Sequence, residues 1–306
     1  MEFTDLSTAF TEKQKVGSFL YLQNYLLEKT ENKEKFFIGR LSGNETNLCG
    51  KRLSKSDIPL NLLHEMLTGA GIQMRSSEDI DHYVNLYITS CRNSSLLSVW
   101  DSGMYAQAKT YYNFLDKTNP TQKRICAHAL EPFYFMDHPE YKFNQVFKNK
   151  KVLIITSHKA TTIKQLKNHT GIFSKQIFDE STEFHVYKPA QQNAGNHDGN
   201  SWTFHLEKMK QELSEVVNET FDFDIALVSC GGFGMLVSDY IFSHLGKSVM
   251  YVGGGLQLFF GINGNRWKTH PSILKLINKK WANVLNEDKP PSLSLNPRLC
   301  ENSCYW

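Results

Sequence analysis

Three apolar runs in the second half of the chain each end in a turn of small residues and lead into a helical pattern. They span 151–155, 224–229 and 248–252 and consist mostly of Val, Ile, Leu and Met. Runs of this kind are typical of strands that are buried on both faces. Because strands that alternate with helices are joined by right-handed crossovers, the pattern predicts an α/β fold with a mainly parallel sheet.

The first half carries a weaker version of the same pattern. An amphipathic helix is expected over 13–29, and a short strand over 36–40 that ends in the polar loop 41–45. The segment 58–121 has mostly helical spacing and is interpreted as a helical insert. The stretch 130–135 is expected to be extended, because its proline disfavours a helix.

We therefore expect a modified Rossmann-like sheet with flanking helices in a single domain over 1–306. Within it, 1–145 holds the first strand and the helical insert, 146–270 the Rossmann-like core, and 271–306 a C-terminal tail that packs back on the core.

Composition excludes several classes of protein. The net charge is only +3 over 306 residues, with basic and acidic residues interspersed, which disfavours nucleic acid as the main partner. No apolar run resembles a signal peptide or a membrane span, so a cytoplasmic protein without a transmembrane segment is expected. The cysteines are spaced unlike a disulfide framework and are expected to be reduced.

Loops of small residues follow the predicted strands at 42–45, 157–158, 231–234 and 253–255. In a parallel sheet these loops converge on one edge. Glycine lets the backbone approach a phosphate closely, and the amides of a following helix favour an anion, so a bound diphosphate is the expected ligand. The alternative is that the glycines only make tight turns. No turn has the spacing of a dinucleotide-binding or phosphate-binding loop, so an oxidoreductase or kinase is not indicated.

Several side chains at these loops suit chemistry on a diphosphate-linked substrate. Glu45 is placed to bind a metal–diphosphate or a sugar hydroxyl, or is simply an acid in the first turn of a helix. Arg40 is expected to neutralise phosphate or to form a salt bridge. Asp101 and Glu131 are candidate general bases, or ordinary loop acids. His158 is expected to contact phosphate, to act in proton transfer or to cap its helix.

A further pair, Arg266 and Trp267, follows the turn 261–264 and is expected to close the pocket. The indole offers a stacking face to a sugar or a base, although a tryptophan is as easily part of a core.

At these same residues the chain resembles the GT-D-type glycosyltransferases and related polysaccharide-biosynthesis proteins of bacteria and large DNA viruses. The resemblance lies in the blocks 38–45, 152–158 with 162–165, 224–267 and 304–306. Within the third block, 252–267 is the most specific part.

The resemblance implies a hexosyl- or pentosyltransferase that moves a sugar from a nucleoside-diphosphate sugar to a growing glycan or glycolipid acceptor. The expected donor-binding residues are Arg40, Ser42, Gly43, Asn44, Ser157, His158, Gly231, Gly232, Phe233, Gly234, Gly253, Gly254, Gly255, Gln257 and Arg266. The expected catalytic residues are Glu45, Asp101 and Glu131.

One position departs from the family pattern. The family carries Asp-x-Glu in the first loop to hold a divalent metal, whereas this chain has Gly43-Asn44-Glu45. Either Glu45 binds Mn²⁺ or Mg²⁺ with the diphosphate, or Arg40 and backbone amides replace the metal's charge.

Two other functions are consistent with the sequence. A non-catalytic subunit that binds a nucleotide or glycan would explain the lost aspartate. A methyltransferase with a Rossmann-type fold has weaker support, because no acidic residue ends the strand after the first glycine turn.

Overall fold

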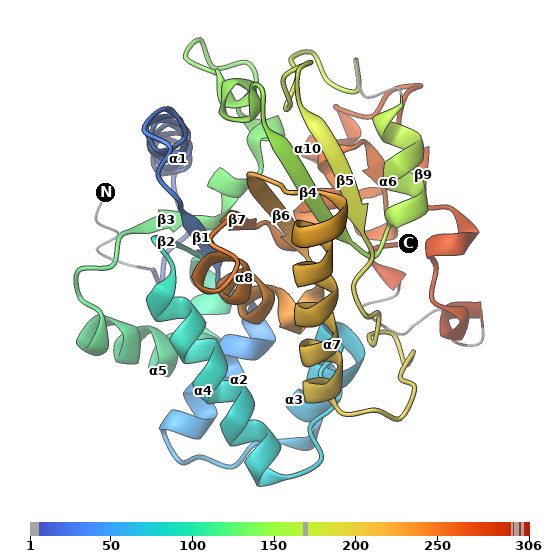
Figure 1. The fold of residues 1–306 in the computed structure, drawn as a ribbon. Helices are drawn as coiled ribbons and strands as arrows, with labels where there is room; N and C mark the ends of the chain where they lie inside the picture. The colour runs from blue at the N-terminus through green and yellow to red at the C-terminus, as the bar shows by residue number, and fades with distance from the viewer. Residues whose placement is uncertain (1–5, 168–170, 295, 297–299, 301–302) are drawn as a thin grey trace.

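The computed structural model describes residues 6–167, 171–294, 296, 300 and 303–306. Within these residues, seven strands form one entirely parallel sheet in the order β3-β2-β1-β7-β6-β4-β5 (Figure 1). Their bounds are β1 Phe37–Arg40, β2 Leu96–Val99, β3 Arg124–Cys126, β4 Lys151–Thr156, β5 Glu183–Tyr187, β6 Ile225–Ser229 and β7 Ser248–Tyr251. The predicted α/β fold with a parallel sheet is confirmed.

Three of these strands, β2, β3 and β5, were not expected from the sequence. The segment 58–121 does hold helices, but it also holds β2, which pairs with β1 on one side and β3 on the other. Strands β2 and β3 are four and three residues long, too short to stand out beside the helical patterns around them. The stretch 130–135 forms 3₁₀ turns, Ala127–Leu130 and Pro132–Tyr134, because Pro132 suits the first position of a turn.

Helices cover both faces of the sheet. The helices are α1 Glu12–Glu31, α2 Gly43–Leu53, α3 Leu60–Glu65, α4 Ser77–Asn93, α5 Ser102–Thr118, α6 Lys159–Leu166, α7 Trp202–Glu215, α8 Gly234–Ser243, α9 Leu256–Phe259 and α10 Pro271–Leu274. Side chains of α2, α4, α7 and α8 pack with one face of the sheet, and those of α1 and α9 with the other. A short parallel pair, β8 Ile262–Asn263 and β9 Ala282–Asn283, lies beside α6. None of the described helices is long and apolar enough to cross a membrane.

The core follows from the two-residue period of the strands. Phe37 belongs to the cluster on the α8 face, whereas its neighbour Ile38 belongs to the cluster on the α1 face. The same alternation holds along β4, β6 and β7. Because both faces are buried, these strands read as continuous apolar runs, which is why the sequence reveals them.

The start of α8 is packed directly against β7. A Cβ on Gly234 would overlap the ring of Tyr251, whose hydroxyl donates a hydrogen bond to the Gly231 carbonyl at 2.9 Å. We expect Gly234→Ala to destabilise the fold by about 1–3 kcal/mol, because the buried ring of Tyr251 has no room to move away from the added methyl group. Urea unfolding measures the change. Gly50→Ala in α2 is the control, since its added methyl meets only ordinary contacts at 3.5 Å. Equal stability of Gly234→Ala and wild type would contradict this packing.

Candidate functional site

A cavity of about 450 Å³ lies at the carboxyl edge of the sheet. Residues that directly follow β1, β2, β4, β6 and β7 line it, as does Glu131, which follows β3 after one 3₁₀ turn. The lining residues are Arg40, Ser42, Gly43, Asn44, Glu45, Gly69, Ala70, Trp100, Glu131, Ser157, His158, Asn193, Ser229, Gly231, Tyr251, Gly253, Gly254, Gly255, Gln257, Arg266, Trp267, Tyr305 and Trp306. The predicted convergence of small-residue loops is therefore present.

The topology explains why a cavity forms at this edge. After β1 the chain moves outward to β2 and β3, whereas β7 and β6 lie on the other side of β1. Connections that leave adjacent strands in opposite directions open a crevice above the strand ends. The sheet thus supplies the position at which open α/β folds hold their ligands.

Arg40 ends β1 and turns its guanidinium over the indole of Trp100, with 5.1 Å to the ring centroid. It also lies against the backbone of Gly253, where an added Cβ would come within 2.7 Å of Nη1. Gly253 has a φ of +70°, a conformation that favours glycine. Among the described residues, no carboxylate lies within ion-pair distance of Arg40. The guanidinium is therefore held in place while its charge remains unpaired.

Glu131 lies between the two 3₁₀ turns that follow β3. Burial raises the pKa of its carboxyl to about 7, although Arg40 and Arg266 both act to lower it. The carboxyl packs against the second glycine turn, where a Cβ on Gly255 would come within 2.7 Å of Oε1. An acid with this pKa exchanges its proton near neutral pH, which is what a general base or acid requires.

Glu45 is the second carboxylate of the cavity. It lies in the first turn of α2 and is only 5% exposed. Burial raises its pKa, whereas its own backbone amide and the Arg40 charge lower it. Glu45 is thus an acid in the first turn of a helix that also lines the cavity, and its binding of a sugar hydroxyl or a diphosphate stays a prediction.

Tyr251 connects the loops after β1, β6 and β7. Besides its bond to the Gly231 carbonyl, its hydroxyl lies 3.4 Å from Ser42 Oγ. Burial raises the pKa of Tyr251, so the hydroxyl stays protonated near neutral pH. The phenol fixes the spacing of these loops at the cavity.

The start of α6 differs from what the sequence suggested. Ser157 and His158 do line the cavity, but the amides of Ala160 and Thr161 donate to the carboxylate of Asp288 at 3.0 and 2.7 Å. The helix N-terminus thus already holds an anion that belongs to the protein. His158 precedes the helix without capping it through its side chain.

His158 is buried, and this burial lowers its pKa to about 4. Its imidazole is therefore neutral at pH 7 and offers hydrogen bonding instead of positive charge. Its Nε2 atom is buried without a hydrogen-bond partner among the described residues.

Asp288 ties the C-terminal segment to the core. Its carboxylate also accepts a hydrogen bond from Thr161 Oγ1 at 2.6 Å, and its carbonyl accepts one from Trp306 Nε1 at 3.2 Å. We expect Asp288→Ala to lower the free energy of unfolding by about 3 kcal/mol, because three buried donors lose a charged acceptor. Thermal and urea unfolding measure the loss. Exposed Asp57→Ala is the control, and a loss no larger than in that variant would contradict the role of Asp288.

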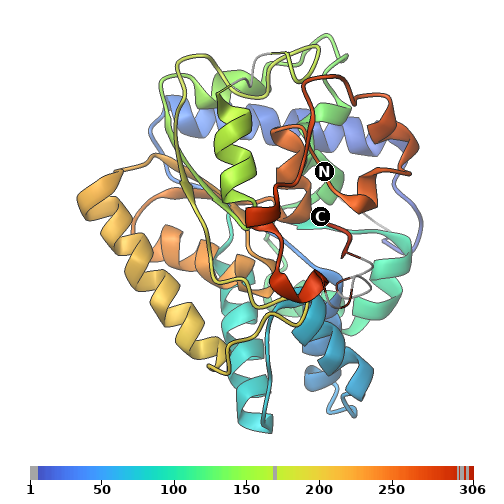
Figure 2. The same ribbon diagram turned by 90° about the vertical axis from the view of Figure 1, so that its right-hand side faces the viewer.

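Tyr305 and Trp306, the last two residues of the chain, line the cavity. Figure 2 marks where the C-terminus lies in the fold. The ring of Tyr305 lies under Arg266, with 4.9 Å from the guanidinium carbon to the ring centroid. It also packs on Gly254, where an added Cβ would come within 2.5 Å of the ring. The ring of Trp306 meets that of His158 edge-on, with centroids 6.2 Å apart. Aromatic faces and a second cation thus line the same cavity as Arg40 and Glu131.

Four predicted site residues lie outside this cavity. Asp101 accepts a hydrogen bond from the backbone amide of Phe10, so its carboxylate is committed to the packing of the N-terminal segment. Gly232, Phe233 and Gly234 turn into the core beneath α8, and Phe233 is 1% exposed. The packing of Gly232, Phe233 and Gly234 fits the simpler interpretation of a tight turn between packed elements, and that of Asp101 fits an ordinary loop acid.

Other parts of the lining have no signal in the sequence. Ala70 comes from the π-helical turn Met66–Ala70 after α3, and its carbonyl packs against Gly231. Asn193 comes from the loop after β5, and β5 is a strand that the sequence did not predict. Trp100 follows β2, and recognition of that short strand would have indicated it. Trp267 lines the cavity as expected.

The residues present do not fit a divalent metal held by the protein. Glu45 is the carboxylate available in the first loop, and its buried position disfavours the charged form that a metal needs. Within the described residues, no three His, Cys, Asp or Glu side chains gather as metal ligands.

Taken together, the cavity combines two cations, two buried acids, a neutral histidine and aromatic faces. This set can hold an anionic group and exchange a proton next to it. Comparisons with protein-family models, curated proteins and solved structures gave no match.

Proposed function

We propose that this protein is a glycosyltransferase that uses a nucleoside-diphosphate sugar. The supporting observation is that Glu131, with a pKa of about 7, lies in one cavity with Arg40 and Arg266 at the carboxyl edge of a parallel sheet. Displacement at an anomeric carbon needs stabilisation of the leaving diphosphate and a base for the acceptor hydroxyl. The volume of about 450 Å³ is in the range of small-molecule sites, about 300–1,000 Å³.

In this proposal each charged group has one task. Arg40 and Arg266 bind the diphosphate and stabilise the charge that develops as the sugar leaves. Glu131 takes the proton of the acceptor hydroxyl. Glu45, whose carboxyl pKa is raised by burial, hydrogen-bonds the sugar or the diphosphate. Trp100 and Tyr305 offer faces for the base or the sugar.

A thermal-shift screen of the full chain tests donor binding. The ligands are uridine and guanosine diphosphates and their sugars, each with Mn²⁺, with Mg²⁺ or with chelator. A ligand at a hundred times its dissociation constant should add about 2.7 kcal/mol of stability. We expect a shift that survives the chelator, because Arg40 and Arg266 supply the positive charge. No shift with any nucleotide would refute the proposal.

The second candidate is a non-catalytic subunit that binds a nucleotide or glycan. The observation that favours it is the single carboxylate of the first loop, where the family that the sequence resembles carries two. Slow hydrolysis of the bound donor by the purified protein, lost in Glu131→Gln, would favour the enzyme. A thermal shift without any hydrolysis or transfer would favour the binding subunit.

A further inference from the structure

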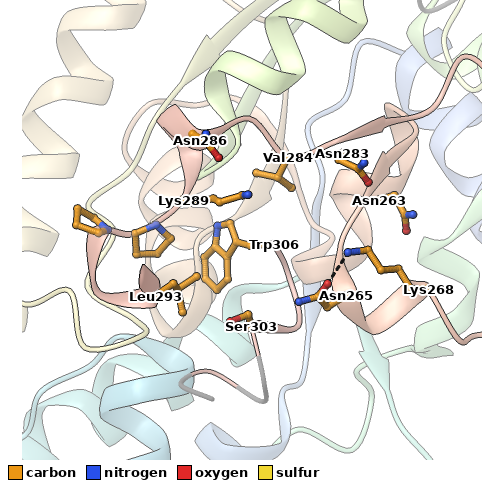
Figure 3. Close-up of a pocket in the computed structure, with 12 residues that line it drawn as sticks. Asn263, Asn265, Lys268, Asn283, Val284, Asn286, Lys289, Leu293, Ser303 and Trp306 are labelled. Carbon is orange, nitrogen blue, oxygen red and sulfur yellow. Dashed lines mark hydrogen bonds between the residues drawn. The ribbon is translucent and has the colours of Figure 1, made fainter. Parts of the chain in front are cut away.

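Two further hollows adjoin the cavity on the side of the C-terminal segment. The nearer has a volume of about 630 Å³ and shares Trp306 with the cavity (Figure 3). The farther has a volume of about 600 Å³ and shares Asn286, Lys289 and Pro291 with the nearer one. The three hollows therefore follow one another along this face, from the loop after β5 to the strand ends.

Side-chain amides line both hollows, together with apolar side chains such as Val284 and Leu293 in the nearer one. The nearer one is lined by Asn263, Asn265, Asn283 and Asn286, and the farther one adds Gln191, Gln192 and Asn196. Figure 3 shows the indole of Trp306 between Asn286 and Lys289 on one side and Asn265 and Asn283 on the other. An amide both donates and accepts hydrogen bonds, as a sugar hydroxyl does, and an aromatic face packs on the apolar face of a sugar ring.

The amides are in part free to bind a ligand. Asn263 Oδ1 is buried and has no hydrogen-bond partner among the described residues. The side chains of Asn283 and Asn286 are exposed at the rim. Asn265 is partly occupied, because its Oδ1 accepts a hydrogen bond from Lys268 Nζ at 2.6 Å. Exposed amides such as those of Asn283 and Asn286 can exchange bound water for the hydroxyls of a sugar.

The charge of this face argues for a largely uncharged ligand. Lys188, Lys268 and Lys289 of the two linings are offset in part by Asp198 and Glu287 of the farther one. A nucleic acid would need a stripe of unopposed cations, which this lining does not form. An uncharged or weakly charged chain of hydroxyl groups matches it better.

We infer that these two hollows form an acceptor groove for an oligosaccharide of several sugars, whose reactive hydroxyl enters the cavity beside Trp306. This inference rests on the proposed function, because it assigns the acceptor of the same reaction. It extends that function by assigning the place on this chain where several sugars of the acceptor would bind.

An array of immobilised mono- to decasaccharides, probed with the full chain, tests the groove. We expect the wild type to bind oligosaccharides in preference to monosaccharides. The double variant Asn283→Ala/Asn286→Ala should bind about tenfold more weakly, as the loss of two hydrogen bonds implies. The control is Asn113→Ala, an exposed asparagine of α5 outside the groove. If no oligosaccharide binds, or if the double variant binds like the wild type, the groove is refuted.

The thermal shift with nucleotides, measured on the same samples, separates this inference from the function on which it rests. We expect the double variant to keep the nucleotide shift of the wild type, because both changes lie outside the donor cavity. A nucleotide shift without glycan binding would overturn the groove and leave the transferase proposal standing. Glycan binding that the double variant loses, without any nucleotide shift, would support the groove and overturn the transferase.

Discussion

Replacing Glu131 with glutamine is expected to lower the rate of sugar transfer about 10²- to 10⁴-fold, the usual contribution of a general base. The amide keeps the shape of the side chain and its packing against Gly255, but it cannot take a proton. In the wild type the rate should rise with pH through about 7, where the carboxyl loses its proton. Steady-state rates from pH 5 to 9 with the donor that passes the thermal-shift screen measure both effects.

The same substitution should raise stability at high pH. Burial raises the folded-state pKa of Glu131 from 4.5 to about 7, so the stability that the neutral acid provides is present below pH 4.5 and is lost as pH rises through 7. Glutamine stays neutral, and the variant should therefore be more stable than wild type at pH 8 by up to about 3 kcal/mol. At pH 4.5 the two should be nearly equal.

Lower activity together with higher stability at pH 8 would distinguish an acid kept for function from one that stabilises the fold. Glu219→Gln, on an exposed turn after α7, serves as the control and should alter neither quantity. A Glu131→Gln protein that transfers sugar at the wild-type rate would remove Glu131 from the mechanism. If the stability of Glu131→Gln varied with pH in the same way as that of the wild type, ionisation of the Glu131 carboxyl would not destabilise the fold, and the carboxyl would not have a raised pKa.

The parts of the fold that the sequence predicts are those whose patterns are local. Strands β4, β6 and β7 are buried on both faces, so each appears as an unbroken aliphatic run. Strand β5 lies at the edge of the sheet, and its residues Glu183, Phe184 and His185 are only partly buried or exposed. Strand β2 is central but only four residues long. Neither carries enough periodic signal to be separated from its surroundings.

The site residues likewise fall into those that a local pattern predicts and those that depend on contacts between distant parts of the chain. Loops that follow predicted strands, such as Arg40–Glu45 and Gly253–Gly255, lie at the cavity because parallel strands end at one edge. The capping of α6 by Asp288 is a contact between residues more than a hundred positions apart, and no local pattern announces it. The choice between Asp101 and Glu131 likewise depends on burial, which the sequence of a loop does not encode.

Arg40 provides the second large expected effect, because its charge acts on both the ligand and Glu131. Arg40→Met keeps an unbranched chain over Trp100 and Gly253 but removes the cation. We expect the dissociation constant of the nucleoside diphosphate to rise about 10- to 100-fold, as the loss of a charge-assisted hydrogen bond implies. Calorimetric titration with that diphosphate measures this change.

The pH profile gives a second measurement that loss of affinity alone would not move. Since the Arg40 charge lowers the pKa of Glu131, its removal should raise that pKa and shift the rising limb of the rate profile to higher pH. Arg40→Lys keeps a positive charge, so its profile should stay near that of the wild type while its affinity falls. Arg52→Met, which breaks a surface ion pair with Asp81 on the outer side of α2, controls for the loss of one positive charge. Weak binding with an unshifted profile would show that Arg40 holds the diphosphate without acting on Glu131, and the base would then be tuned by burial and Arg266 alone.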